Sequence, residues 1–171
     1  MRQVDENYSP VQLEKDLRTK WESTRIYEKV KQAHEEDKPY YFVDGPPYTT
    51  GSIHIGTAWN KVLKDTYIRY RRMQGLQVRD QPGYDMHGLP IEVKVEQSLG
   101  IKSKKEIEVH GIDKFVTTCR EFATTFKSKM TEEFKLLGVW MDWENPYLTV
   151  NPSYVASVWW TLKQAHDKNL L

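Results

Sequence analysis

The most constraining feature of the sequence is a strand-like run followed by a turn-rich loop and a long amphipathic pattern. Residues 40–43 are aromatic and β-branched, which is typical of a buried strand. Residues 44–51 contain two glycines and two prolines and predict a loop. Apolar residues then recur every three or four positions from Ile55 to Met73. This spacing predicts an amphipathic helix that ends near Gly75.

The sequence after this helix favours a parallel α/β fold. Residues 76–79 predict a second strand, and a strand that is reached through a helix normally runs parallel to the first. Helical spacing returns from Ile112 to Leu137, with Gly138 at its end, and again after Asn151, a predicted cap that precedes a proline. We therefore predict a partial Rossmann-like nucleotide-binding fold with parallel strands and several long helices.

The chain divides into two predicted regions. Residues 9–32 mix apolar positions with many charges and begin at Ser9-Pro10, a predicted cap and first turn, so residues 1–38 are interpreted as a helical arm. Residues 39–171 form the α/β region. The sequence stops at Asn169-Leu170-Leu171 without a glycine, proline or polar tail, and we expect a chain truncated from a much longer parent.

The composition favours a soluble protein of about one domain. The 171 residues are 39% hydrophobic, which is enough to bury a core. Lys and Arg number 25 against 24 Asp and Glu, so a nucleic-acid contact would need a local basic patch. A single cysteine, Cys119, excludes an internal disulfide framework. No signal-like or membrane-spanning run is present, and we predict a cytoplasmic protein without a membrane partner.

The loop between the first strand and its helix is the best candidate site. Ligands of parallel α/β sheets bind at the carboxyl ends of strands, and a helix amino terminus favours an anion such as a triphosphate. His54 would add a hydrogen-bond donor aimed at the phosphates, and Gly56 would let a ring lie close to the backbone. The alternative is that His54 caps a turn and the glycines only shape the loop. Neither a Walker loop nor a GxGxxG fingerprint is present.

A second candidate site follows the second strand. Asp85 comes after Pro82-Gly83, a predicted turn, where a carboxylate beside an apolar pocket could pair with the ammonium group of an amino acid. The alternative is that Asp85 caps the turn before Gly88. His87 fits a structural hydrogen-bonding role better than a reactive one.

Other residues receive simpler interpretations. Cys119 lies on an apolar helical stripe and fits a core residue better than a nucleophile. His34, His110 and His166 lack ligand-like spacing, so no metal site is predicted within the chain. The helix at 55–73 carries a basic side that could approach tRNA or phosphate, although a solvated face is the commoner explanation. Its members are Lys61, Lys64, Arg69, Arg71 and Arg72.

Two blocks of the sequence resemble class I aminoacyl-tRNA synthetases. The stretch from Pro47 to Thr57 resembles their His-Ile-Gly-His signature region. Gly83-Tyr84-Asp85-Met86-His87-Gly88-Leu89-Pro90-Ile91-Glu92 resembles the block that follows it in the isoleucine branch, while the valine and leucine branches share the first block in outline. The likeness runs from Asn7-Tyr8-Ser9-Pro10 to the Trp143 and Asn145-Pro146 region. Thr57 stands where the motif has a second histidine, a variant similar to that of archaeal-type isoleucine enzymes, and it offers one hydroxyl instead of an imidazole.

The resemblance implies a reaction and its participants. L-isoleucine would be activated by ATP with Mg²⁺ and transferred to tRNA(Ile) by a full-length, monomeric parent. His54 and Thr57 would be catalytic, and Gly45, Pro46, Asp85 and His87 would bind the amino acid. The ATP-binding residues would be Pro47, Tyr48, Thr49, Thr50, Gly51, Ser52, Ile53, His54, Ile55, Gly56 and Thr57.

The resemblance also implies that part of the active site lies elsewhere. The Lys-Met-Ser-Lys-Ser loop, the editing insertion and the anticodon-binding helices are not in this sequence, and zinc is possible only in the remainder of the parent. The fragment alone would therefore be nearly inactive. The alternatives are a valine or leucine synthetase, another nucleotidyltransferase with a His-x-Gly-His type of loop, and a non-catalytic nucleotide- or tRNA-binding module.

Overall fold

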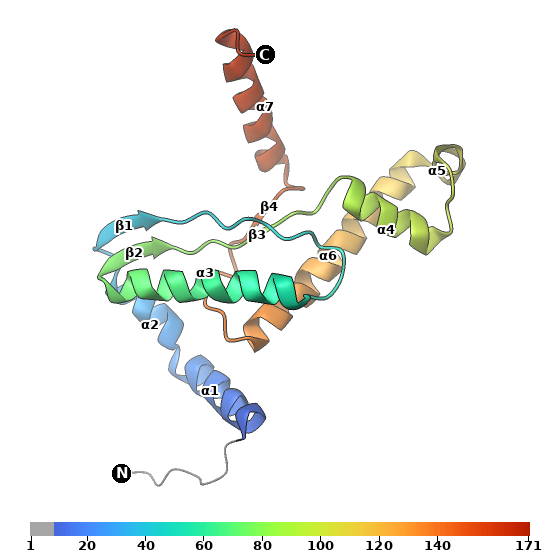
Figure 1. Cartoon of the computed structure of the whole chain (residues 1–171). Coiled ribbons are helices and arrows are strands. Elements are labelled where there is room, and N and C mark those ends of the chain that lie inside the picture. The colour runs from blue at the N-terminus through green and yellow to red at the C-terminus, as the bar shows by residue number, and fades with distance from the viewer. Residues whose placement is uncertain (1–8) are drawn as a thin grey trace, which may run out of the picture.

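The computed structural model describes residues 9–171. The start of the predicted arm and the Asn7-Tyr8 part of the resemblance lie outside the described residues. Within them, a long helix, α3 (Ile55–Met73), runs beside two short strands, and other helices extend from this centre in three directions (Figure 1).

The predicted arm consists of two helices. Helix α1 (Pro10–Thr24) begins with proline in its first turn, as predicted, although the Ser9 side chain forms no capping hydrogen bond. Arg25 adopts a left-handed conformation with φ of 50°, and this breaks the arm before α2 (Ile26–Ala33). The predicted helical arm therefore consists of two helices, and no glycine or proline at Arg25 indicated the break between them.

The two predicted strands, which α3 connects, pair with each other in parallel. Strand β1 (Lys38–Tyr41) pairs with β2 (Leu76–Arg79), with Lys38 opposite Leu76 and Tyr41 opposite Arg79. This confirms the crossover prediction. The prediction of a buried first strand is wrong: Tyr41 is 67% exposed, because the preceding Tyr40 packs against the buried cluster that contains Ile68, and successive side chains of a strand point to opposite faces.

A second, shorter pair of strands was not predicted. Gly83–Tyr84 forms β3 and pairs in parallel with Tyr147–Leu148, which forms β4. The predicted turn at Pro82-Gly83 is wrong, since Gly83 begins this strand. Two-residue strands are too short to show an alternating pattern, so the sequence held no periodicity to reveal them.

The larger hydrophobic core forms where β3 and the residues after it meet two helices, and a third helix packs beside them without a buried residue. Helices α4 (Leu89–Leu99) and α5 (Lys104–His110) pack on α6 (Ile112–Leu136), and only α6 was predicted. Cys119 packs against this core, which confirms its interpretation as a core residue. The buried members of the core are Tyr84, Met86, Ile91, Ala123, Met130 and Phe134.

A smaller core joins α3 to the strands. Ile68 of α3 and Val78 of β2 are buried together with Val139 and Met141, which follow α6. Trp143 packs against both cores. The two cores therefore hold α3, the strands and α6 together around the loop that follows β1.

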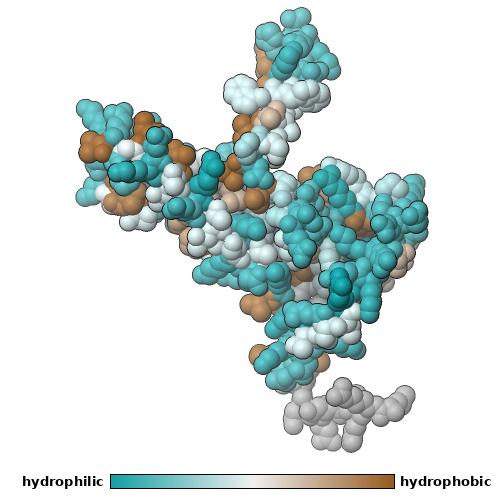
Figure 2. Space-filling view, turned by 180° about the vertical axis from the view of Figure 1, so that it is seen from behind, coloured by the Kyte–Doolittle hydropathy of each residue, from teal (hydrophilic) through white to brown (hydrophobic). Residues whose placement is uncertain are grey.

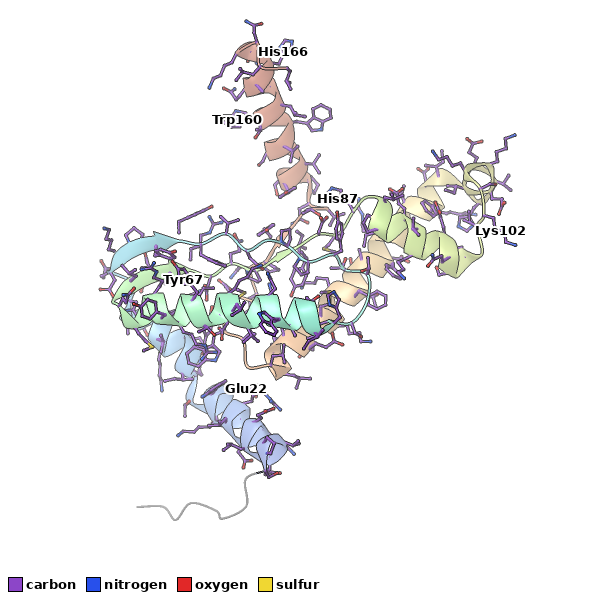
Figure 3. The ribbon with its side chains drawn as sticks, viewed as in Figure 1. Glu22, Tyr67, His87, Lys102, Trp160 and His166 are labelled. Carbon is purple, nitrogen blue, oxygen red and sulfur yellow. The ribbon has the colours of Figure 1, made fainter. Side chains whose placement is uncertain are left out.

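Helix α7 (Pro152–Asp167) projects away from both cores (Figure 1). It contains no buried residue, and Figure 2 shows apolar side chains exposed on it and on the α4–α5 end of the molecule. Trp160, which is labelled in Figure 3, is 63% exposed. No helix between residues 9 and 171 has both the length and the apolar character needed to cross a bilayer.

Candidate functional site

A cleft of about 270 Å³ lies where the loop after β1 meets the first turns of α3. This is the carboxyl end of a parallel strand, where ligands of such sheets bind. The cleft brings two predicted groups of residues together: Gly45 and Pro46 of the amino-acid group, and part of the ATP group. Its lining residues are Gly45, Pro46, Pro47, His54, Gly56, Thr57, Asn60 and Lys61.

His54 is the N-cap of α3. Its Nδ1 atom accepts hydrogen bonds from the backbone N–H groups of Gly56, at 3.1 Å, and Thr57, at 3.4 Å. In a neutral imidazole an accepting Nδ1 leaves the proton on Nε2, so the ring still has one donor for a ligand. Capping and donation, which the sequence presented as alternatives, are therefore compatible. Two of the N–H groups expected to face an anion are, however, satisfied by the imidazole.

Gly56 keeps the imidazole of His54 in place. A Cβ atom at Gly56 would lie 3.1 Å from Cε1 and 3.2 Å from Nδ1 of His54, closer than ordinary contact. A side chain here would push the ring away from the helix terminus. The glycine was expected to leave room for a ring of the ligand, but the ring it makes room for in this structure is that of His54.

Asp44 connects the loop to three other elements. Its carboxylate is fully buried and accepts from Lys61 Nζ at 2.5 Å, from Lys64 Nζ at 2.6 Å and from the Gly83 N–H at 3.0 Å. Its main-chain carbonyl accepts from the hydroxyl of Tyr147. The loop is thereby bonded to α3, β3 and β4 immediately before Gly45.

The basic side of α3 is only partly solvated. Lys61 and Arg72 are 1% and 4% exposed, so the predicted solvated face is wrong for both. Arg72 pairs with the buried Asp80, and Arg69 pairs with Asp65 at 2.7 Å. Arg71 donates to the Tyr67 hydroxyl at 2.6 Å. The sequence did not reveal these pairings because most of the acidic partners come from other elements.

Burial shifts the pKa of groups around Asp44. Desolvation lowers the pKa of Lys61, although the Asp44 carboxylate acts in the opposite direction. Burial, reinforced by the charge of Asp44, raises the pKa of Tyr147 to about 12. Tyr147 therefore remains a neutral hydroxyl donor at physiological pH.

Asp85 lies beside the same loop but is not among the residues that line the cleft. Its N–H donates to the Pro47 carbonyl at 2.8 Å, and its carbonyl accepts from the Thr49 N–H at 3.0 Å. Asp85 Oδ1 accepts from the Thr149 hydroxyl at 3.2 Å and lies 3.7 Å from Nδ1 of His87. The side chain is 22% exposed and can still meet a ligand.

His87 and Thr149 form a short polar cluster with Asp85. His87 Nδ1 and Thr149 Oγ1 are 2.6 Å apart, and Thr149 also accepts from the Met86 N–H at 2.9 Å. His87 is 58% exposed and lies close to the base of α7 (Figure 3). Sequence reasoning missed Thr149, because an isolated threonine 64 residues from Asp85 carries no motif.

Glu133 is a second residue that the sequence did not indicate. This carboxylate of α6 accepts from the Ile53 N–H at 2.7 Å, directly before His54. Glu133 looked like an ordinary charged position on an amphipathic helix. Its partner is a main-chain group, which leaves no trace in side-chain patterns.

The remaining predicted ATP residues do not line the cleft. Thr49 is buried, where its N–H bonds to Asp85, while Tyr48 and Ile55 are 48% and 81% exposed. Thr50, Gly51 and Ser52 form a bend, and Ile53 follows it directly before His54. Between residues 9 and 171, no three His, Cys, Asp or Glu side chains are grouped in a way that could hold a metal ion.

The sequence that forms these parallel strands, the loop and the capped helix matches a known family. The family described as tRNA synthetases class I (I, L, M and V) matches residues 16–171, and the chain belongs to this family. Its relatives include isoleucine–tRNA ligases. The chain is 56% identical over 166 residues to the isoleucine–tRNA ligase of Pyrococcus furiosus, covering 96% of this chain. It is 54% identical over 172 residues to that of Methanothermobacter thermautotrophicus, covering 100% of this chain.

The comparison with solved structures agrees on the fold. A LeuRS of Agrobacterium radiobacter, crystallised in a ternary complex with tRNA and LeuAMS, matches with a TM-score of 0.65 and 24% identity over 92% of this chain and 18% of that chain. The chain spans only 16% of the length of the isoleucine–tRNA ligases above.

Proposed function

We propose that this chain is the amino-terminal part of an isoleucine–tRNA ligase and supplies one half of its activation site. The observation that carries the proposal is the cleft that joins the Gly45-Pro46 loop to the His54-capped start of α3. Gly45, Pro46, Asp85 and His87 bind isoleucine, and residues 47–57 bind ATP, with His54 and Thr57 nearest the chemistry. The identity with isoleucine–tRNA ligases of two archaea favours isoleucine over valine or leucine.

The proposed reaction needs no nucleophilic side chain. A carboxylate oxygen of isoleucine attacks the α-phosphorus of ATP, the bond from that phosphorus to the β-phosphate oxygen breaks, and pyrophosphate leaves with the bond electrons. A hydroxyl oxygen of the terminal adenosine of tRNA(Ile) then attacks the carbonyl carbon of the adenylate, the bond from that carbon to the phosphate oxygen breaks, and AMP leaves with the bond electrons. Catalysis is positioning and stabilisation of negative charge, for which His54 Nε2–H and the positive end of α3 are suited. Mg²⁺ enters with ATP as its counter-ion.

Asp85 is the proposed ligand for the ammonium group of isoleucine. Thr149 and His87 both approach its Oδ1 atom, so Oδ2 is the oxygen that we assign to the substrate. The main chain of Asp85 is hydrogen-bonded to Pro47 and Thr49. These bonds fix the position of the proposed ammonium ligand relative to the proposed ATP-binding loop. A charge-assisted hydrogen bond at a partly buried carboxylate contributes about 1.5–3 kcal/mol.

The remaining functions belong to the longer ligase. We propose that it acts in the cytoplasm as a monomer, that it binds tRNA(Ile) largely through parts beyond these 171 residues, and that this chain alone is nearly inactive. The test is isoleucine-dependent exchange of pyrophosphate into ATP, measured on the full-length ligase and on this chain. We expect exchange in the ligase with isoleucine, much weaker exchange with valine or leucine, and almost none in the chain alone. Stronger exchange with valine or leucine, or no exchange with any amino acid, would contradict the proposal.

A further inference from the structure

An unbalanced charge lies beside the cleft, and one of its three members, Lys61, lines it. The Asp44 carboxylate meets two ammonium groups, those of Lys61 and Lys64, and we call these three residues the Asp44 triad. One negative and two positive charges leave the triad with a net charge of +1. Lys61 lines the same cleft as His54, so the surplus charge belongs to the candidate site.

We propose that Lys61, through the surplus positive charge of the Asp44 triad, is a positioning residue that draws the phosphate chain of a nucleotide into the cleft. The inference rests on the proposed function and deepens it, because it assigns nucleotide affinity to a group outside the 47–57 segment. Lys61 does this while bonded to Asp44, so no lysine has to reach the phosphates directly.

The surroundings of Lys61 make its charge effective. Its side chain is 1% exposed, and its Nζ atom lies 4.9 Å from the ring centre of Phe134 and 5.9 Å from that of Trp143. Water and salt therefore screen this charge less than that of a surface lysine. An anion in the cleft would feel the triad more strongly than the solvated lysines elsewhere on the chain.

Asp44 fixes the position of this charge. Besides the two lysines, its carboxylate accepts from the Gly83 N–H at 3.0 Å, and Lys64 also donates to the Gly45 carbonyl at 3.0 Å. The positive centre is thus tied to the loop that forms one wall of the cleft. The geometry favours a polyanion over isoleucine, because a zwitterion carries no net charge for the triad to attract.

The experiment varies the net charge of the Asp44 triad in the full-length ligase. The affinity for ATP is measured by calorimetry for each variant. Lys61→Met removes the surplus charge and retains an apolar stem. Asp44→Asn combined with Lys61→Met restores the net charge of +1 without the ion pair. Lys64→Met removes the same charge from a side chain that is 18% exposed, and it replaces Lys61→Met if that variant does not fold. Lys163→Met is the matched control, because Lys163 is exposed on α7 and pairs only with Asp167 among the described residues.

At low salt we expect Lys61→Met and Lys64→Met to weaken ATP and pyrophosphate binding by about fivefold or more, with isoleucine affinity unchanged in Lys61→Met. The double variant should recover most of the ATP affinity, and the loss in the single variants should shrink at high salt. Equal ATP affinity in Lys61→Met and the original ligase, or no recovery in the double variant, would overturn the inference. An original ligase that binds no ATP would instead refute the proposed function.

Discussion

The backbone N–H of Ile53 donates to Glu133 Oε2 over 2.7 Å, across a sequence separation of 80 residues. This bond anchors the residue before His54 to α6, so the larger core helps to hold the start of α3. Removal of the carboxylate by Glu133→Ala leaves a partly buried N–H without its partner, which costs about 1–3 kcal/mol. We expect lower stability and slower adenylate formation in the full-length ligase.

The matched variant for this prediction is Glu133→Gln, whose amide oxygen can still accept from Ile53. It should keep most of the stability and most of the rate. Urea unfolding and single-turnover adenylate formation measure the two effects. If Glu133→Ala matched the original protein in both assays, the anchor would have no role.

Gly83 is required by the close approach of Tyr147. A Cβ atom at Gly83 would lie 2.1 Å from Cζ of the Tyr147 ring, so Gly83→Ala must displace either the ring or β3. We expect a loss of about 1–3 kcal/mol of unfolding free energy. Gly51→Ala is the control, since nothing lies within 4 Å of its added Cβ, and its thermal unfolding should match that of the original protein. Equal stability of the two alanine variants would contradict this packing.

The buried Tyr84 predicts a pH dependence of stability. Burial raises the pKa of its hydroxyl to about 12, and this hydroxyl bonds to Thr131 at 2.6 Å. Because the folded pKa exceeds the unfolded pKa of about 10, the contribution of Tyr84 is fully present below about pH 10 and is lost as the pH rises toward the folded pKa. Tyr84→Phe should therefore be less stable at neutral pH, by about 1 kcal/mol.

The stability gap between the original protein and Tyr84→Phe should close at alkaline pH. Urea unfolding of both proteins, from neutral pH upward, measures this gap while cancelling the titration of other groups. A gap that stayed constant above pH 10 would show that the Tyr84 hydroxyl is not held in its neutral form.

Asp85→Asn retains the shape of the proposed ammonium ligand and deletes its charge. In the full-length ligase we expect isoleucine to bind about tenfold more weakly or worse, with ATP affinity nearly unchanged. Isoleucinol, which keeps the ammonium group, should lose the same affinity, whereas an analogue without the amino group should bind both proteins equally poorly. Calorimetry with these ligands is the measurement. Unchanged isoleucine affinity would contradict the proposed ammonium contact and would leave Asp85 with a structural role, its hydrogen bond with Thr149.

The sequence predicted the features that rest on long periodic patterns. The 19-residue helix α3, the 25-residue helix α6 and the parallel pairing of β1 with β2 all follow from apolar spacing and from the crossover rule. Helix α4 was missed because its apolar residues fall at every second position from Leu89 to Val95, a spacing that is as typical of a strand as of a helix. The break at Arg25 was missed because an arginine gives no sign of a left-handed backbone.

The candidate site was only partly predictable for a related reason. His54, Gly56 and the Gly45-Pro46 loop lie close together in the sequence, so one motif indicated all of them. Lys61 was interpreted as part of a basic surface. The apolar pattern of α3 alone does not show that Lys61 is buried and paired with Asp44. Glu133 and Thr149 reach the site from distant elements, and their contacts follow from tertiary packing.

The central claim is that the His54-capped start of α3 stabilises the transferring phosphate, and replacing His54 with asparagine tests it most directly. Asparagine is a good N-cap, so His54→Asn preserves the helix start, while its amide N–H groups lie one bond closer to the backbone than the imidazole Nε2 and so do not replace the Nε2–H donor at its position. His54→Ala removes both. In single-turnover adenylate formation by the full-length ligase, we expect both variants to lose about 2.7–4 kcal/mol of transition-state stabilisation, with isoleucine affinity retained. An asparagine variant as fast as the original enzyme, beside a slow alanine variant, would show that His54 serves only as a cap and would contradict the account.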